Sequence, residues 1–491
     1  MDQKNKSIKF TRMKTYLLFL GLTSILIVTS CEKFINVDQP DVIEKDHEFK
    51  DKNSIRLSIL GLYGLMTDLV EPMFLAGEVR ADLVVANKSA GTYIKEYGNN
   101  SYSVSNPYIS PKPYYTLINN TNDFIHEFES LLDKQEMDTA DFIMYKSELV
   151  AIRVWTQYQI AKIFGKCKYY SKVLVPGDTS GITEFTYGNE LLNKLVTDLQ
   201  FSDTNNFTTD EQDITEQVVR FSDFYVNALL GELYLDLGNY EDAYDKFNEV
   251  TSRGDNVNRI STSGRFNVVS SFEINWFNDL FQNTTSSLVN NLVFAIAFDS
   301  YYNQTNELWN WTTSLNYQVA PATWYINQFR EHAYKYEDYF DIRYNSVLNT
   351  TEIERTYAIS KYLYDDYPFI VMRTARLELL KAYCLNFMGK NAITLVNKIR
   401  KRLDFPEIDV SDMPENDTAK TIWLEDKIVD ELAYETGFEG QRWFDLMRIA
   451  KRRDDPSYLA DKVAQKYTDV ELKKEIRSKL MDEKNWYIPI F

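Results

Sequence analysis

The chain has 491 residues, of which 44% are hydrophobic and 26% are charged, an ordinary globular composition with enough apolar material for a large core. Its formal net charge of −18 argues against a nucleic-acid partner, because phosphate binding needs a surplus of lysine and arginine. Only 17 glycines and 12 prolines interrupt the chain, and this scarcity favours helices.

The first 31 residues have the pattern of an export signal. A basic start is followed by an apolar run from Leu17 to Val28, and Thr29, Ser30 and Cys31 come next. This run is too short to cross a hydrocarbon core, which needs roughly 20 residues. We therefore predict that residues 1–30 are a lipoprotein signal peptide and that Cys31 carries the lipid. The alternative is a signal peptide without lipidation, in which Cys31 is incidental.

Residues 224–250 fit the pattern of a tetratricopeptide repeat. The residues in register are Leu230, Gly231, Tyr234, Gly238, Tyr240, Ala243 and Phe247. Gly231 and Ala243 are small enough to let two antiparallel helices approach closely, and Gly238 with Asn239 is expected to form the turn between them. Because one repeat cannot bury its own apolar face, further helical pairs are required.

Weaker helical periodicity recurs in three other places along the chain. Residues 142–164 with 189–199 form one candidate pair, residues 375–403 form another around a turn at Gly389, and residues 420–436 with 440–452 form the last. The sequence therefore predicts a mostly α fold with about four tetratricopeptide-like helical pairs. Residues 77–122 and 252–325 are rich in Asn, Ser, Thr and Tyr with short strand-like runs such as 292–298, and loops of this length are usually functional or disordered. Their aromatic content favours the functional interpretation.

Several stretches resemble one protein family. Residues 438–459, FEGQRWFDLMRIAKRRDDPSYL, are similar to the C-terminal signature of the SusD/RagB family, whose positions here are Glu439, Gly440, Arg442, Asp445, Leu446 and Arg448. Further similar stretches are residues 148–164, 371–383, 397–402, 424–435 and 485–490. The extra Thr436-Gly437-Phe438 before Glu439 departs from the pattern of many members, and puts in doubt only where the preceding helix ends.

This resemblance implies a fold in which the tetratricopeptide-like helical pairs carry a large irregular, loop-rich ligand-binding lobe, and it implies a function as well. It implies a cell-surface lipoprotein of the outer membrane that captures glycan and delivers it to a SusC-like TonB-dependent transporter. Residues 31–491 would be the SusD-like domain, with the tetratricopeptide-like helices of its N-terminal part in 31–250 and the C-terminal SusD/RagB part in 251–491. The same role for a peptide or another nutrient is one alternative, and a tetratricopeptide adaptor of the envelope is another.

The sequence offers little that points to catalysis, a metal or a cofactor. Its three histidines, His47, His126 and His332, do not stand at metal-ligand spacing, and no nucleophile elbow or phosphate-binding glycine loop is present. A glycosidase-type carboxylate pair would be set by the fold and is invisible here. We expect no enzyme, no metal and no cofactor, and we interpret Cys167 and Cys384 as buried thiols.

The signature pair Arg442 and Asp445 stands three residues apart on a predicted helix. Acid–base work is one interpretation of this carboxylate and guanidinium. We favour the other, a structural ion pair that fixes the helix.

A sugar site needs flat aromatic faces surrounded by polar side chains. Two segments supply them, and the predicted ligand-binding residues are Asp82, Asn87, Tyr93 and Tyr97 from the first and Trp309, Trp311 and Tyr317 from the second. Asp82 could instead cap a turn. Trp309 and Trp311 would face one side of an extended segment, although buried strand aromatics would show the same spacing. Trp324 and Tyr325 follow Pro321 at a predicted helix start, and we assign both to the core.

Overall fold

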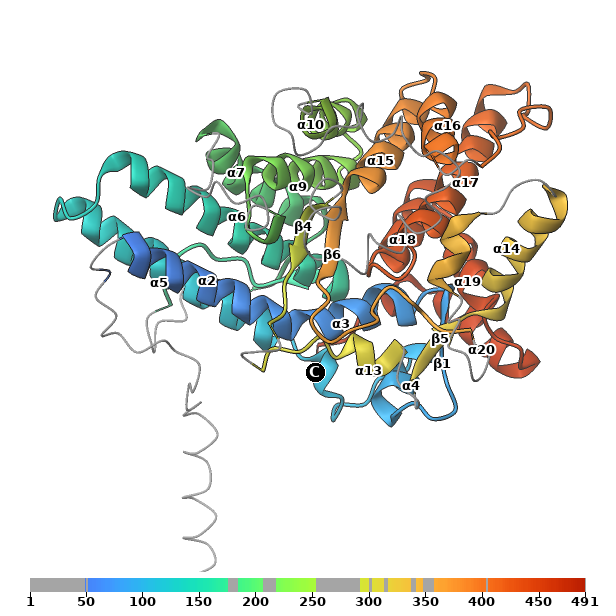
Figure 1. Cartoon of the computed structure of the whole chain (residues 1–491), viewed down its shortest axis with the longest axis horizontal. Helices are drawn as coiled ribbons and strands as arrows, with labels where there is room; N and C mark the ends of the chain where they lie inside the picture. Colours follow the sequence, from blue (N-terminus) through green and yellow to red (C-terminus); the bar gives the residue numbers. More distant parts are fainter. Residues whose placement is uncertain are drawn as a thin grey trace, which may run out of the picture. The chain divides into compact units, whose positions relative to one another are not determined.

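Helices dominate the computed structural model, which describes residues 49, 52–174, 184–205, 218–252, 292–299, 303–312, 317–336, 341–347, 357–402 and 405–490 (Figure 1). The predicted mostly α fold is thereby confirmed. Arg56–Phe491 forms one compact unit, to which the contacts below belong. The predicted signal peptide and Cys31 lie outside the described residues.

The four predicted helical pairs are present, and their bounds differ from those expected by at most six residues, at the end of α7. They are α6 (Thr139–Phe164) with α7 (Gly188–Asn205), α9 (Asp223–Asp236) with α10 (Tyr240–Ser252), α15 (Thr374–Phe387) with α16 (Ile393–Arg402), and α17 (Asp417–Thr436) with α18 (Arg442–Arg453). Successive pairs pack on each other, α7 on α9 and α10 on α15, so the repeats form one continuous stack (Figure 1).

The α9–α10 pair shows why the repeat needs its small residues. A Cβ atom on Gly231 would lie 2.4 Å from the Phe247 ring, so only glycine lets the two helices approach this closely. Gly238 has a φ of +79° in the turn between them, a conformation that other L-residues rarely adopt. Both predictions for this repeat are confirmed.

Several helices were not expected. They are α2 (Lys52–Met66), α3 (Val70–Phe74), α4 (Thr92–Gly98), α5 (Lys112–Asp133), α13 (Leu308–Thr312), α19 (Pro456–Ala464) and α20 (Val470–Leu480). The expectation that 77–122 is irregular was wrong for α4 and for the part of α5 that it contains. Asn120 and Asn122 interrupt the apolar pattern of α5, but both are buried: Asn120 Nδ2 donates to the Thr116 carbonyl at 2.9 Å, and Asn122 Oδ1 accepts from Arg153 Nη1 at 2.9 Å. Because buried polar residues stand on its core side, the apolar periodicity of the sequence did not predict this helix.

One helical stretch, Lys52–Val79, is long and apolar enough to cross a membrane by length and composition. In the structure, 56% of its most apolar window is buried within the protein. A core helix passes the same test, so this stretch is weak evidence for a membrane span.

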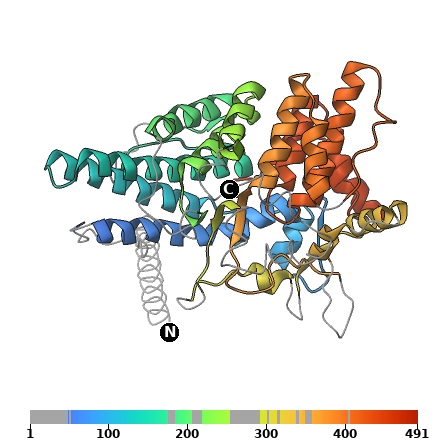
Figure 2. The ribbon, with the colours of Figure 1, turned by 45° about the horizontal axis from the view of Figure 1, so that its top comes forward.

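The strands form short antiparallel pairs beside the helices. They are β1 (Val84–Ala86) with β5 (Val319–Pro321), β2 (Lys166–Cys167) with β3 (Thr186–Tyr187), and β4 (Leu292–Ile296) with β6 (Phe369–Arg373). The predicted strand-like run at 292–298 is therefore a strand. Together with α13 (Leu308–Thr312) and α14 (Thr323–Lys335), β5 belongs to the segment between the repeats, drawn in yellow below the helical stack (Figure 2).

Cys167 and Cys384 are both buried free thiols, as predicted. Burial raises the pKa of each thiol to about 12. Neither cysteine is suited to act as a nucleophile at neutral pH, because the thiolate is the reactive form.

Candidate ligand-binding surface and the contacts behind it

The two segments predicted to carry the site lie side by side. β1 pairs with β5 in a register that sets Val84 opposite Pro321 and Ala86 opposite Val319. Beyond the strands, the Asn87 amide donates to the Gln318 carbonyl at 2.8 Å. α4 packs against β1 and α13 against β5, so residues more than 200 positions apart in the sequence share one surface (Figure 1).

Polar side chains hold the two segments together at that surface. Asn87 Nδ2 and Ser89 Oγ donate to the Tyr317 carbonyl at 3.2 and 3.0 Å. The Gly91 amide donates to Gln318 Oε1 at 3.0 Å. The position of Tyr317 is therefore fixed by the first segment.

Three aromatic rings reach solvent here. Tyr93 is 36% exposed, and Trp309 and Tyr317 are half-buried. With Asn87, Ser89 and Gln318 they form what we call the aromatic surface. Half-buried rings can be fixed by their neighbours and still present a face to a ligand.

The other three predicted ligand residues are placed in the interior. Asp82 and Tyr97 are completely buried, and Trp311 is 2% exposed. The Tyr97 hydroxyl donates to the Tyr108 carbonyl at 3.0 Å, and the Trp311 ring stands edge-on to Tyr108 with 5.6 Å between centroids. In this structure Asp82, Tyr97 and Trp311 support the aromatic surface from behind and offer no face to a ligand.

Trp309 and Trp311 do not form a paired platform, because their segment is not extended. They belong to α13, where residues two apart point about 200° from each other. Trp309 can therefore face outward while Trp311 enters the core. The core assignment made for Tyr325 is confirmed, because this residue is 1% exposed. Trp324 is half-buried, and its Nε1 donates to the Asp82 carbonyl at 2.7 Å.

A polar hollow of about 310 Å³ lies beside the start of α13. Its lining includes the carboxylates Asp68, Glu71 and Glu307 and the amides Asn303, Gln304 and Asn306. Burial, and then the charges of Glu307 and Asp68, raise the pKa of Glu71 to about 7. Sequence reasoning missed this hollow, since the three carboxylates come from two distant segments.

The residues of the C-terminal signature make contacts in the interior and do not contribute to the aromatic surface. Arg442 Nε and Nη2 donate to the two oxygens of Asp82, each at 2.8 Å. Glu78 Oε1 accepts from the backbone amides of Gln441 and Arg442 at 3.1 and 3.4 Å. A Cβ atom on Gly77 would lie 1.9 Å from the Gly440 carbonyl oxygen. Residues 77–82, GEVRAD, are thus joined to the C-terminal signature.

The Arg442–Asp445 ion pair needs a correction. Both residues are structural, as predicted, but they are not each other's main partners. Asp445 binds Arg376 Nη1 and Nη2 at 2.9 and 2.8 Å, and Arg448 Nη1 at 3.1 Å. The helix spacing suggested a local pair, whereas the tertiary structure supplies closer partners from α15 and from residues 77–82.

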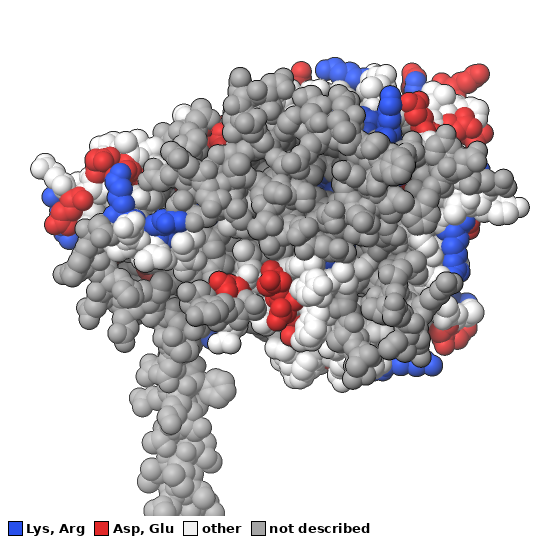
Figure 3. All heavy atoms as spheres, in the orientation of Figure 1, with Lys and Arg blue, Asp and Glu red and all other residues white. Residues whose placement is uncertain are grey.

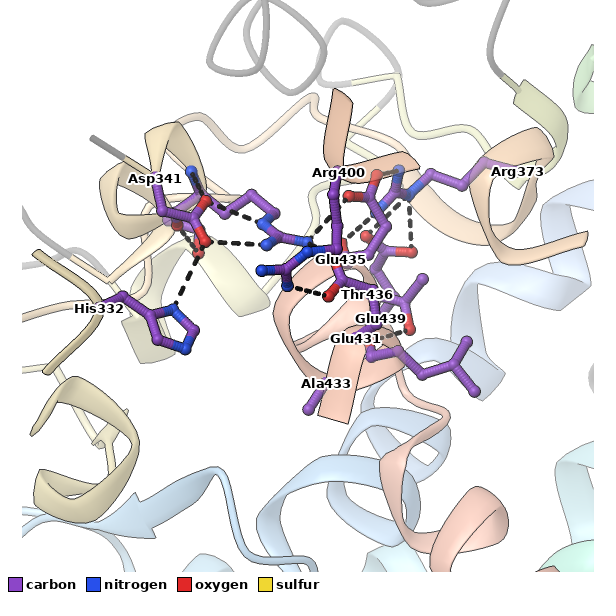
Figure 4. Close-up of polar contacts among 12 residues, drawn as sticks. His332, Asp341, Arg373, Arg400, Glu431, Ala433, Glu435, Thr436 and Glu439 are labelled. Carbon is purple, nitrogen blue, oxygen red and sulfur yellow. Dashed lines mark hydrogen bonds and ion pairs between the residues drawn. The ribbon is translucent and has the colours of Figure 1, made fainter. Parts of the chain in front are cut away.

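Further family-like stretches meet in a buried ionic network (Figure 4). Glu431, Glu435 and Glu439 follow each other at intervals of four residues, and Arg373 Nη1 donates to Glu435 Oε1 at 2.7 Å. Arg343 Nη1 donates to Glu431 at 2.5 Å. The remaining members are Asp341, Lys361 and Arg400. Four carboxylates face four basic groups, so the network is balanced, which buried charges require.

Basic and acidic side chains are interspersed on the face shown in Figure 3, and no extended basic patch gathers among its coloured residues. Within the described ranges no group of three or more His, Cys, Asp or Glu side chains could hold a metal ion.

The fold places this protein in the class of helical-repeat scaffolds. Its stack of tetratricopeptide-like pairs carries an irregular lobe with an aromatic surface. The sequence model of the SusD family matches residues 291–491. A SusD-like protein of Formosa agariphila is 26% identical over 478 residues, covering 88% of this chain and 91% of that protein.

Solved structures show the same fold. A SusD superfamily protein of Bacteroides vulgatus aligns with a TM-score of 0.69 at 16% identity, covering 90% of this chain and 96% of that chain. A laminarin-binding SusD-like protein aligns with a TM-score of 0.64 at 17% identity, covering 86% and 95%. Residues 291–491 therefore match the SusD family, and the chain as a whole has the fold of the solved SusD superfamily structures.

Proposed function

We propose that this protein is a cell-surface lipoprotein that captures glycan at the aromatic surface and delivers it to a SusC-like TonB-dependent transporter. The observation that carries the proposal is the set of three accessible rings, Tyr93, Trp309 and Tyr317, beside fixed polar groups. A family relative that binds laminarin supports the choice of glycan over other cargo.

Stacking is the physical basis of the proposed capture. Hydroxyl hydrogen bonds made in water replace bonds to water, so each contributes only about 1 kcal/mol net. Burying the C–H face of a sugar ring against an aromatic face adds apolar contact, which has no such competition. The amides and hydroxyls at the rim then give orientation and specificity.

The test is calorimetric titration of purified protein with a polysaccharide panel that begins with laminarin. For the best ligand, Trp309→Ala and Tyr93→Ala are each expected to weaken binding about tenfold or more, with the fold retained by circular dichroism. Tyr334→Ala is the matched control, since Tyr334 is 86% exposed on α14 and lies outside the aromatic surface. Folded variants that bind as tightly as the wild type would place the site elsewhere.

The same experiment tests two other hypotheses, a peptide cargo and an adaptor role. Binding of peptides in place of glycans would favour the peptide alternative. Binding of neither class would favour an adaptor that works through its helical repeats. The aromatic surface favours the glycan proposal, because accessible rings next to amides suit a polyhydroxylated ring.

We infer that Cys31 anchors the mature protein, residues 31–491, in the outer membrane, and that the partner there is a SusC-like transporter. The apolar run that ends at Cys31 supports the anchor, and the match to the SusD family supports the partner. Co-purification of tagged protein with a TonB-dependent transporter from outer membranes tests the partner. Recovery of the tagged protein alone under mild detergent would count against it.

We propose that the protein binds its glycan without cleaving it. The hollow beside α13 is the place to test this, because the pKa of Glu71 is raised to about 7 there and Glu307 is near. A carboxyl group with a raised pKa beside a second carboxylate is the arrangement found in glycosidases. End-group analysis after prolonged incubation with the bound glycan is expected to match a boiled control. New reducing ends that disappear in Glu71→Gln would make the protein a hydrolase.

A further inference from the structure

A second cavity, of about 350 Å³, lies among the helical pairs. Its walls come from α6, α7, α9, α10, α15 and α18, and none of its lining residues belongs to the aromatic surface or to the hollow beside α13. Aromatic side chains contribute much of the wall, among them Tyr240, Tyr383 and Phe444. The volume is within the range of sites for small organic ligands.

Lys162 lines this cavity and is 6% exposed. Its ammonium lies 4.7 Å from the centroid of the Tyr158 ring and 5.1 Å from that of Phe444. Among the residues that the structure describes, it has no hydrogen-bond or ion-pair partner. Burial lowers the pKa of Lys162, while the charges of Glu232 and Asp236 act in the opposite direction without forming an ion pair with it.

Asp236, the acidic residue that lines this cavity, already has hydrogen-bond partners of its own. Asp236 accepts from the Tyr158 hydroxyl at 2.6 Å and from Arg448 Nε at 2.7 Å, so each of its oxygens has a donor. The four basic lining residues, Lys162, Arg448, Lys451 and Arg452, therefore outnumber Asp236. Arg452 binds Glu425 at 2.8 and 2.5 Å, whereas Lys162 has only the two ring faces.

We propose that this cavity binds a small organic acid whose carboxylate lies against Lys162 and whose ring packs on Tyr240, Tyr383 and Phe444. The carboxylate supplies the hydrogen-bonded partner that this ammonium lacks among the described residues, and a charge-assisted hydrogen bond is stronger than a neutral one. The aromatic wall takes the body of the molecule. The proposal stands whether or not the aromatic surface binds glycan, since the two sites share no residue.

Two classes of compound combine a carboxylate with a ring in this way. One is a uronic acid, and the other is an aromatic acid, such as the C-terminal aromatic residue of a peptide. Two matched pairs of probes separate them: methyl glucuronoside with methyl glucoside, and phenylacetate with its neutral amide, phenylacetamide. Calorimetry on the purified mature protein is expected to show that one acid binds at least about tenfold more tightly than its neutral counterpart. The pair that responds identifies the source.

The variant that tests the assignment is Lys162→Met, which keeps an unbranched apolar chain against the two rings and removes the charge. It should abolish the preference for the acid. Lys146→Met is the matched control, because Lys146 is on the same helix, is paired with Glu129 at 2.7 Å and lines no part of the cavity.

The proposal fails if neither acid binds more tightly than its neutral counterpart, or if folded Lys162→Met keeps the preference. Lys162→Arg keeps a positive charge and is expected to retain binding. Should Lys162→Met not fold, the wild-type comparison within each probe pair and loss of the preference in Lys162→Gln decide the question.

Discussion

Arg442 and Asp82 are 360 residues apart in the sequence and form a bidentate ion pair in the interior. Arg442 is 3% exposed and Asp82 is completely buried, so neither charge is solvated by bulk water. The pair connects β1 and the segment before it to the first turn of α18. The region behind the aromatic surface therefore depends on a contact with the C-terminal signature.

Breaking this pair is expected to destabilise the protein strongly. Arg442→Met leaves the Asp82 carboxylate buried without its partner, which typically costs about 3–5 kcal/mol of unfolding free energy. Urea unfolding of the two proteins measures the difference. Arg477→Met is the control, since Arg477 and Asp461 form an exposed pair at 2.5 Å and the loss there should stay below about 1 kcal/mol. Equal effects of the two substitutions would contradict the structural role of Arg442.

Gly77 is expected to tolerate no side chain. In Gly77→Ala the new Cβ would lie 1.9 Å from the Gly440 carbonyl oxygen, and both contacting groups are backbone that cannot move aside without shifting α18. We expect loss of folded protein or a cost above about 3 kcal/mol. Gly91→Ala meets only the Gln318 side chain at 3.5 Å and should be nearly neutral. A folded Gly77→Ala protein of wild-type stability would refute this close backbone contact.

Glu78 should make the protein less stable as the pH rises. Burial raises its pKa from the ordinary 4.5 to about 7 in the folded state. The folded state therefore holds the proton more tightly than the unfolded state, so the stabilisation is fully present below about pH 4.5 and is lost as the pH rises through 7. The full shift corresponds to about 3 kcal/mol.

The experiment compares wild type with Glu78→Gln by chemical unfolding between pH 4.5 and pH 8. Gln cannot ionise, so the variant should gain stability relative to wild type as the pH rises. Other titrating groups, including Glu71, are common to both proteins and cancel in the difference. A difference that stays constant across this range would show that Glu78 does not titrate there.

Cys31→Ala should release the protein from the membrane. Without the thiol there is no site for the diacylglycerol, and several buried acyl chains provide the anchoring energy. We expect the wild type in the membrane fraction and the variant in the soluble fraction after cell fractionation. Retention of Cys31→Ala after a high-salt wash would mean that another part of the chain holds it there.

The sequence determined the helical pairs, because the information for them is local. Gly231 and Gly238 stand where a tetratricopeptide repeat needs a close approach and a turn, and the repeat pattern alone predicts both roles. The resemblance to the SusD/RagB family can be recognised for a related reason, because its motifs are runs of adjacent residues such as 438–448. Those motifs are core contacts, and core contacts constrain sequence wherever they occur.

The tertiary structure alone decided which residues face a ligand. The spacing of Trp309 and Trp311 would put both on one side of an extended segment. In the helix α13, however, one faces outward and the other packs in the core. The partners of Asp82 and Lys162 likewise depend on distant segments, Arg442 for one and an aromatic cavity for the other. Exposure and charge pairing are properties of the packed chain, so spacing along the sequence could nominate these residues but could not assign their roles.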